Sequence, residues 1–222
     1  MRLRYNSGFC LYNCKGLILT RAYAGENAEV RIQNRRRKLV EAGKKCFGTK
    51  GFAKTKIKDI CVEADLTERY FYESFRNKEA LLGVVYVTLV DDMIGSLMAV
   101  AEEFQGRPVE AMRNLLIGYF TLFQDDPNRA QVQLFEILGV SDELNKVYQE
   151  KIREATLQMK SMVSNFLPSV PEDQLNPIYF TAFSGSLWQI ANEWVLSGFE
   201  QDIEDLVAPL EKIINALFQV NF

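Results

Sequence analysis

Apolar residues recur at intervals of three and four along most of this chain, from about residue 31 onward. That spacing places them on one side of a helix, where they can pack against a core. No segment shows a convincing run of the period-two alternation that is typical of strands. The pattern therefore predicts an all-α protein of about nine helices, with neither internal repeats nor low-complexity segments.

The first part of the pattern predicts three helices in quick succession. The first covers residues 32–51 and stops at Gly51, because glycine readily adopts the left-handed backbone that ends a helix. Thr55 is expected to cap a second helix over residues 56–64, and a three-residue turn leads to a third over residues 67–75. Two short helices joined by such a turn predict a helix-turn-helix.

Longer helices are predicted after this segment. Asn77 is a suitable cap for a long fourth helix that ends at residue 104, because its side chain can accept a hydrogen bond from a first-turn amide. A fifth helix follows and runs to about residue 123. The remaining predicted helices are a sixth through residue 138 and others over residues 142–166, 173–197 and 202–219.

The third predicted helix contains the unusually aromatic stretch TERYFYESF. Phe71 and Phe75 are four positions apart and share one face, so they are expected to close a small three-helix core. Each buried ring contributes about 2–3 kcal/mol, which a domain this small needs. The other side chains then project from the opposite face, where they can contact another molecule.

Charge is divided unevenly along the chain. Residues 1–80 carry 18 Lys and Arg against 9 Asp and Glu, a net charge of +9, whereas residues 81–222 carry 8 against 20, a net charge of −12. Together they give the formal charge of −3. Such asymmetry favours a basic part that meets a polyanion and an acidic part kept away from it.

The sequence contains no histidine, which excludes Ser-His-Asp and Cys-His nucleophiles and histidine-ligated metals. We predict no catalytic residue, no metal site and no cofactor. Cys10, Cys14, Cys46 and Cys61 are too few and too unevenly spaced for a disulfide scaffold, and this usage fits the cytoplasm.

No run of the sequence approaches the roughly eighteen apolar residues of a membrane-spanning helix, so no membrane partner is predicted. Residues 1–30 form an N-terminal extension with early arginines and an A-Y-A triplet similar to a cleavage site. Asn13 and Lys15 interrupt the apolar region that a signal peptide needs. The extension is expected to be a tail or a segment packed on the body, and its basic residues would suit a position near DNA.

The segment CFGTKGFAKTKIKDICVEADLTERYFYESFRNKEALL resembles the DNA-binding domain of the TetR/AcrR family of bacterial transcriptional regulators. The resemblance implies a helix-turn-helix domain over residues 31–76 and a ligand-binding and dimerisation domain over residues 77–222. Asp65 stands where the family usually has glycine, and Arg69 where it often has a small residue. The residues that match at the family's spacing are Phe47, Gly51, Thr55, Ile57, Ile60, Ala64, Thr67, Tyr72, Phe75, Lys78, Glu79 and Leu81.

Side chains of the second helix in a helix-turn-helix reach the major groove, where arginine can bind guanine and glutamate can accept from cytosine. A phenol or an ammonium group instead contacts phosphate and sets the register, and the resemblance implies this role for Tyr72 and Lys78. The candidate DNA contacts are Thr55, Lys56, Thr67, Glu68, Arg69, Tyr70, Tyr72, Glu73 and Lys78.

Some of these candidates also have a purely structural explanation. Tyr70 can pack on the neighbouring helix, and Glu73 can neutralise Arg69 one turn earlier. Thr55 and Thr67 each begin a predicted helix, so each hydroxyl can cap that helix, contact phosphate, or do both.

The acidic remainder of the chain is rich in aromatic residues in its middle helices. Core packing explains most of them, and some are expected to line a cavity for a small molecule. A neutral or cationic apolar effector fits best, because few basic residues follow residue 107. The candidate lining residues are Tyr119, Phe120, Phe123, Phe135, Tyr148, Trp188 and Asn192, the last as a polar anchor.

The last two predicted helices carry more apolar surface than one partner helix needs, which predicts a homodimer with a four-helix interface. Small residues such as Ala182 and Gly185 permit close approach there. The alternative is an entirely intramolecular core. In a dimer, the long helix that starts at Lys78 would act as a lever between effector and DNA.

These observations predict a ligand-responsive DNA-binding regulator, most often a repressor, that binds a palindromic operator as a dimer and is released by an effector. One alternative is an all-α small-molecule-binding protein or enzyme whose basic N-terminal part serves another anionic partner. Another is a helix-turn-helix that has lost its reading ability, which Glu68 and Arg69 allow.

Overall fold

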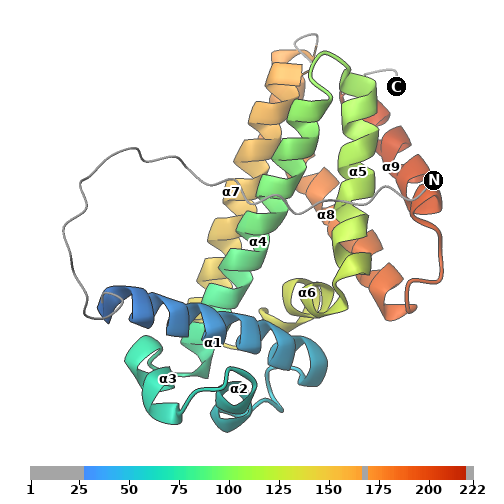
Figure 1. The fold of residues 1–222 in the computed structure, drawn as a ribbon. Coiled ribbons are helices and arrows are strands. Elements are labelled where there is room, and N and C mark those ends of the chain that lie inside the picture. Colours follow the sequence, from blue (N-terminus) through green and yellow to red (C-terminus); the bar gives the residue numbers. More distant parts are fainter. Residues whose placement is uncertain (1–27, 167–169, 219–222) are drawn as a thin grey trace, which may run out of the picture.

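The computed structural model describes residues 28–166 and 170–218, and all regular secondary structure in these two ranges is helical (Figure 1). The all-α prediction is confirmed. The helices are α1 (Ala28–Lys50), α2 (Ile57–Glu63), α3 (Glu68–Ser74), α4 (Lys78–Glu103), α5 (Pro108–Asp125), α6 (Pro127–Gln131), the π-helical turn η1 (Val132–Glu136), α7 (Asp142–Phe166), the 3-10 turn η2 (Glu172–Leu175), α8 (Pro177–Leu196) and α9 (Ile203–Phe218).

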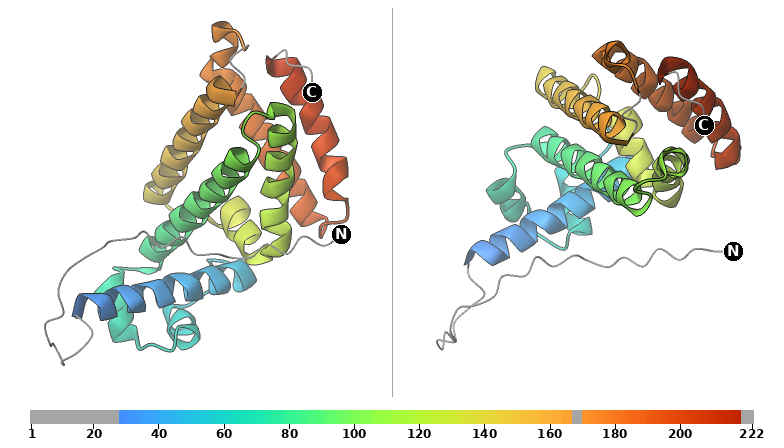
Figure 2. Two further views of the ribbon diagram at one scale, coloured as in Figure 1. Left: turned by 45° about the horizontal axis from the view of Figure 1, so that its top comes forward. Right: turned by 90° about the horizontal axis from the view of Figure 1, so that it is seen from above.

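The helices form two groups at opposite ends of the molecule. α1 lies across the lower end of α4, and α2 and α3 lie on the side of α1 that faces away from the other helices (Figure 1). α4, α5, α7, α8 and α9 form a bundle above α1, and Figure 2 shows the same arrangement from two further directions. The helix-turn-helix therefore projects from one end of a larger helical body.

The smaller group has its own apolar core. Leu39 and Phe47 of α1, Ile60 of α2 and Phe71 of α3 are all fully buried in it. The core continues into the first half of α4, where Leu82 is also fully buried. α4 therefore begins as part of the core that supports the helix-turn-helix.

A second core lies among α5, α8 and α9. Phe120 and Trp194 meet edge to face with ring centroids 5.5 Å apart, and Phe180 lies 5.1 Å from Phe218. Edge-to-face contact is favoured because the positive edge of one ring meets the negative face of the other. The first pair holds α8 to α5, and the second pair, whose rings are tilted, holds α9 to α8.

Several predicted start and stop signals are confirmed. Gly51 has a φ of 77° where α1 ends, and Asp65 has a φ of 53° in the turn between α2 and α3. Aspartate is one of the few residues besides glycine that enter this left-handed region routinely. The Asn77 side chain accepts a hydrogen bond from a first-turn amide of α4 at 2.8 Å.

Three predicted helix boundaries are wrong. α1 begins at Ala28 and not at residue 32. The sixth helix does not continue to residue 138, because α6 ends at Gln131 and the chain passes through η1 instead. The helix predicted from residue 173 begins at Pro177, after η2, and is capped by the Asn176 side chain. Turns of the π type are frequent at functional sites.

Gly48 allows α1 and α6 to approach closely. A Cβ atom added at Gly48 would lie 2.4 Å from the Cβ of Asn128, a distance too short for any side chain. Beside this contact, Lys44 pairs with Asp126 at 2.6 Å, and Arg129 donates to a backbone carbonyl of α4 at 2.7 Å. α6 is thereby fixed to both α1 and α4.

α4 is the one described helix whose length and apolar composition would allow it to cross a bilayer. Core helices of globular proteins share that composition. Here α4 buries Leu81, Val85 and Leu89 against the first core and also packs along α5 and α7. These neighbours bury part of its apolar surface.

Candidate nucleic-acid interface

Hydrogen bonds define the start of α2 and the turn that leads to α3. The Lys56 amide, at the start of α2, donates to Asp59 Oδ2 at 3.0 Å, and this bond is the main cause that lowers the pKa of the Asp59 carboxyl. After α2, the Leu66 amide donates to the Cys61 carbonyl at 2.9 Å. The two helices are therefore held in position within the chain itself.

Two aromatic residues anchor α3, as predicted. Phe71 and Phe75 are 0% and 4% exposed, and their ring centroids are 5.9 Å apart. Arg36 of α1 donates to the Ser74 carbonyl at 2.7 Å, and its guanidinium carbon lies 4.3 Å from the centroid of the Phe75 ring. The inner face of α3 is thus closed against α1.

The opposite face of α3 is exposed. Thr67, Glu68 and Arg69 are exposed, and Tyr72 is 57% exposed. Thr67 is the N-cap residue of α3, yet its side chain makes no capping bond. The hydroxyl is therefore not needed by its own helix, and these four side chains lie where a duplex could reach them.

Tyr70 and Glu73 have partners within the chain. The Arg35 guanidinium carbon lies 4.4 Å from the Tyr70 ring centroid, and Glu73 pairs with Arg35 at 3.7 Å and with Arg69 at 3.1 Å. Contacts that would explain these two residues without DNA are therefore present in the structure. Exposed ion pairs contribute only about 0–1 kcal/mol, so DNA could exchange them at little cost.

Thr55 does not cap α2, because Lys56 occupies the capping position. It is 1% exposed, and its hydroxyl lies 2.7 Å from the Gly51 carbonyl and 3.1 Å from the Cys46 carbonyl. The hydroxyl thus ties the residue directly before α2 to carbonyls in the last turn of α1 and just after it. The predicted phosphate contact through this hydroxyl is therefore wrong, whereas Lys56 is exposed and stays a candidate.

Lys78 also has an internal role. Its Nζ donates to the carbonyls of Phe52 and Thr55 at 2.6 and 2.8 Å and lies 4.1 Å from the centroid of the Phe52 ring. Burial lowers the pKa of this ammonium group. An ammonium group has three donors, so one is left for a phosphate oxygen.

The arginine run in α1 has a structural role that was not predicted from the sequence. Arg35 and Arg36 are half-buried against the rings of α3, whereas Arg37 and Lys38 are exposed. Helical spacing turns successive residues to different sides, so one run of charge serves both packing and solvent. The signal that could have revealed this is the aromatic stretch, since rings attract cations to their faces.

The predicted effector contacts lie in or beside the second core and its border with the first. Phe120 and Phe123 are almost fully buried, and the Tyr119 ring lies edge-on to both at 5.2 and 5.1 Å. The Tyr148 ring lies 6.1 Å from that of Tyr86, and burial raises the pKa values of all three tyrosines. The others, Phe135, Trp188 and Asn192, are partly buried.

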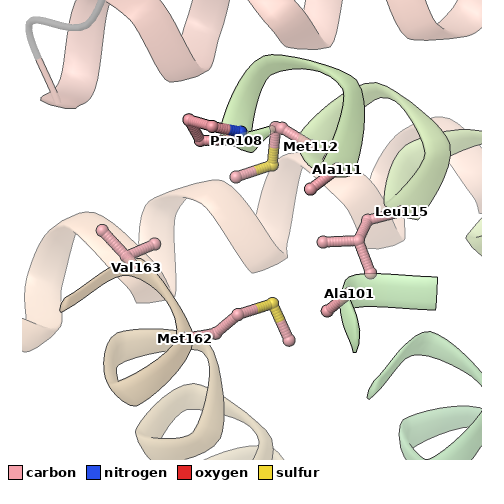
Figure 3. A pocket seen from close by; sticks show the side chains of 7 residues that line it. All are labelled: Ala101, Pro108, Ala111, Met112, Leu115, Met162 and Val163. Carbon is pink, nitrogen blue, oxygen red and sulfur yellow. The ribbon is translucent and has the colours of Figure 1, made fainter. Parts of the chain in front are cut away.

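Neither of the two cavities described in the structure is lined by these seven residues. The larger, of about 350 Å³, lies between the first halves of α4 and α7, beside Gly83, Val84, Leu144 and Val147. The effector role of the seven residues therefore stays a prediction. The smaller cavity, of about 10 Å³, is lined by Ala101, Pro108, Ala111, Met112, Leu115, Met162 and Val163 (Figure 3).

Three buried side-chain atoms in the described residues have no hydrogen-bond partner: Gln133 Oε1, Gln158 Oε1 and Trp188 Nε1. They belong to η1, α7 and α8, outside the helix-turn-helix. An unpaired buried group costs about 1–3 kcal/mol, so native structures keep few of them without a reason. These three atoms can therefore form hydrogen bonds with a polar group of another molecule.

Apolar surface remains exposed on α8 more than on α9. Ile178 and Leu196 are 64% and 71% exposed, and Ala182 and Gly185 lie on the same exposed stripe. The apolar surplus predicted for the last helix is mostly absorbed inside the chain. The residues of α9 that are buried in this way are Leu206, Val207, Leu210, Ile214 and Phe218.

Comparison with known proteins finds a matching family model and similar regulators. Residues 39–85 match the family described as "Bacterial regulatory proteins, tetR family". Over 126 residues the chain is 25% identical to YerO of Bacillus subtilis (strain 168), an uncharacterized HTH-type transcriptional regulator, covering 56% of this chain and 44% of YerO. Over 79 residues it is 29% identical to the HTH-type transcriptional repressor DhaR of Mycobacterium sp. (strain GP1), covering 36% of this chain and 40% of DhaR. The chain thus spans less than half the length of each relative.

Solved structures share the whole fold at low sequence identity. The transcriptional regulator FadR from Bacillus subtilis, solved in complex with stearoyl-CoA, has a TM-score of 0.67 and 18% identity, covering 84% of this chain and 99% of FadR. A transcriptional regulator from Aquifex aeolicus VF5 has a TM-score of 0.62 and 22% identity, covering 83% of this chain and 99% of the other. Likeness at this level concerns the fold alone.

Proposed function

Since the chain belongs to the TetR/AcrR family of bacterial regulators through its N-terminal domain, we propose that it is a transcriptional repressor acting on DNA in the cytoplasm. It binds a palindromic operator as a dimer and leaves it when an effector binds. Members of this family are regulators and not enzymes, in agreement with the prediction of no catalytic residue. The observation that carries the proposal is α3, which is anchored by two buried rings and exposes four polar side chains.

The exposed residues of α3 divide into two kinds of contact. Arg69 has the chemistry to bind guanine O6 and N7, and Glu68 can accept from a cytosine amino group. Tyr72 and Thr67, together with Lys56 at the start of α2, donate to phosphate oxygens and set the register. The net charge of +9 in residues 1–80 supports binding to a polyanion, and the net −12 beyond keeps the rest of the chain away from it.

A dimer with two-fold symmetry supplies a second copy of α3, which contacts the other half of the operator. In such a dimer the two copies of α3 must lie about 34–36 Å apart, or a multiple of that distance, to enter successive turns of the major groove. The exposed stripe of Ile178, Ala182, Gly185 and Leu196 on α8 is the surface proposed for the interface. Small residues in its middle allow the two copies of α8 to approach closely.

The proposed effector has a large apolar part. The second core offers aromatic and aliphatic walls, and FadR from Bacillus subtilis, which has the same fold, was solved with stearoyl-CoA. A long apolar chain is the chemistry that we take from that comparison. A strongly anionic group is less suited here, because few basic residues follow residue 107.

Selection of bound duplexes from a random pool tests the proposal. We expect a two-fold symmetric consensus, two protomers on each duplex, and affinity that falls steeply as salt rises because counterions are released. Arg69→Ala should relax the preference at one base pair of each half-site, by about 1–3 kcal/mol. If no sequence is enriched and binding at low salt is independent of sequence, the proposal is wrong.

A further inference from the structure

The π-helical turn η1 connects the two cores. Val132 is packed in the core that supports the helix-turn-helix, together with Ile137 directly after the turn. Leu134 and Phe135 belong to the second core. Consecutive residues of this short turn therefore face different ends of the molecule, and a change in its geometry affects both.

Glu136, the last residue of η1, holds the segment that leads into α2. Its Oε2 accepts a hydrogen bond from the Phe52 amide at 2.6 Å, and its Oε1 accepts one from Gln131 Nε2 at 2.6 Å. At Gly51, an added Cβ atom would lie 3.3 Å from Glu136 Oε1. The carboxylate thus sits directly against the end of α1.

Phe52 is a junction within the helix-turn-helix. Its carbonyl accepts from Lys78 at the start of α4, and its ring centroid lies 5.6 Å from that of Phe47 in α1. Lys78 also binds the Thr55 carbonyl, directly before α2. A change at the Phe52 amide is therefore felt where α1 ends and where α2 and α4 begin.

Gln133 lies three residues before Glu136 in the same turn and is 6% exposed, with Oε1 unpaired. A buried amide oxygen without a donor destabilises the conformation that contains it. A ligand group that donates a hydrogen bond to this atom would remove that cost. Gln133 of this turn can therefore accept a hydrogen bond from a ligand, whereas Glu136 of the same turn is bound to the helix-turn-helix.

We propose that η1 transmits effector binding to the helix-turn-helix, with Gln133 Oε1 accepting a hydrogen bond from the effector and Glu136 holding the Phe52 amide. The effector is then an apolar molecule that carries a hydroxyl or amide N–H donor. When this donor binds Gln133, the cost of the unpaired oxygen is removed, the turn is stabilised, and Glu136 holds the Phe52 amide more firmly. The consequence for DNA rests on the proposed function, but the coupling itself is measured without DNA.

Hydrogen exchange of the Phe52 amide in the full chain tests the coupling. Glu136→Ala should speed this exchange about tenfold or more, because a bond to a charged acceptor is lost. Glu136→Gln, which keeps an acceptor oxygen, should stay nearer to the wild type. Gln133→Leu removes the unpaired oxygen, stabilises the turn, and should slow exchange of Phe52 severalfold.

The matched control is Gln158→Leu. This substitution also removes a buried, unpaired amide oxygen, but it lies on α7 and outside η1. It should leave Phe52 exchange unchanged. In the double variant Gln133→Leu/Glu136→Ala, the slowing caused by leucine should disappear. The coupling is overturned if leucine at 133 has no effect, if leucine at 158 has the same effect, or if the two changes are additive.

Two isomers test the role of Gln133 as the effector contact. The hydroxyl of 1-octanol can donate a hydrogen bond, whereas 1-methoxyheptane has the same atoms and no donor. At equal concentrations, 1-octanol should slow Phe52 exchange in the wild type and not in Gln133→Leu, and the ether should have no effect. A response that survives in Gln133→Leu, an equal response to the ether, or no response to the alcohol would overturn this role.

These outcomes are separable from those for the proposed function. A chain that shows the coupling but enriches no duplex leaves the role of η1 intact and removes the proposed repressor. A chain that binds a palindromic site while Phe52 exchange ignores position 133 does the reverse.

Discussion

The two ends of this molecule differ in how completely their polar groups are paired. Around the helix-turn-helix, Arg36, Thr55, Lys78 and Glu136 each bind backbone atoms at a place where a helix starts or ends. The buried side-chain atoms without partners, among the described residues, all lie in η1, α7 and α8. At the helix-turn-helix end, none of the described buried polar side-chain atoms lacks a hydrogen-bond partner. At the other end, three such atoms can still bind another molecule.

This difference indicates two ways of serving recognition. A surface that reads DNA benefits from side chains held in place beforehand, because less entropy is then lost on binding. A site that responds to an effector must instead exist in two states of similar free energy, which the ligand can redistribute. Fully paired polar groups therefore suit a surface that reads DNA, and unpaired groups suit a site that responds to an effector.

The largest expected effect comes from removing Phe71, one of the two buried rings that anchor α3. Phe71→Ala should lower the free energy of unfolding by about 3–5 kcal/mol, because it leaves a cavity in a small core. The control is Tyr72→Ala on the exposed face, which should change stability by roughly 0.5 kcal/mol or less but weaken duplex binding. Urea denaturation measures both. Equal losses of stability would show that the two faces of α3 do not differ.

The next effect concerns the exposed stripe on α8. Gly185→Glu should convert the proposed dimer to a monomer, since it places a charge where two helices are expected to touch. Gly95→Glu on α4 is the control, because both glycines are exposed, lie within helices, and have nothing within 4 Å of an added Cβ. Sedimentation velocity measures the mass of each. A dimer that survives Gly185→Glu would place the interface elsewhere.

A smaller loss is expected at Thr55. Thr55→Val keeps the shape but removes the hydroxyl donor shared by the carbonyls of Cys46 and Gly51, which should cost about 0.5–1.5 kcal/mol because the Gly51 carbonyl still accepts from the amide of residue 55. Thr67→Val, on an exposed residue without a capping bond, should have little effect on stability. Thermal denaturation of the two variants compares them. A loss confined to Thr67→Val would reverse the roles given to the two hydroxyls.

The smallest effect is the pH dependence of the contact between α1 and α6. Burial opposes ionisation of Asp126, but Lys44 and the Arg129 amide outweigh it and lower the pKa of the carboxyl. A carboxyl with a lowered pKa stabilises the fold above its unfolded pKa, and this contribution is lost as the pH falls through the folded pKa. Asp126→Asn should therefore reduce stability at neutral pH and flatten its decline below about pH 4.

Denaturation midpoints at several pH values measure this slope. Asp125→Asn, on the exposed neighbour at the end of α5, is the control and should leave the slope unchanged. A slope that Asp126→Asn does not alter would show that the ion pair with Lys44 adds nothing to stability.

Local signals in the sequence were sufficient to predict where most of the helices lie and which face of α3 is buried. Asn77 caps α4, Gly51 ends α1, and Phe71 and Phe75 are buried as their spacing predicts. These features depend on neighbours within a few residues, which the sequence displays directly.

The features that were missed depend on contacts between distant residues. Thr55 begins a predicted helix but is drawn inward by carbonyls of the preceding one. The π turn at η1 satisfies two cores at once, which no local period reveals. The apolar face of α9 was assigned to a dimer because the sequence does not show that α5 packs against it.

Gly48 has a consequence for how movement passes between the two ends. Glycine inside a helix costs about 1 kcal/mol relative to alanine, and here it places bare backbone of α1 against Asn128 of α6. Bare backbone has no rotamer that could absorb a small displacement. A shift of α6 must therefore carry α1 with it as a rigid unit or separate the two surfaces, so motion in the bundle reaches the DNA end without being damped at this contact.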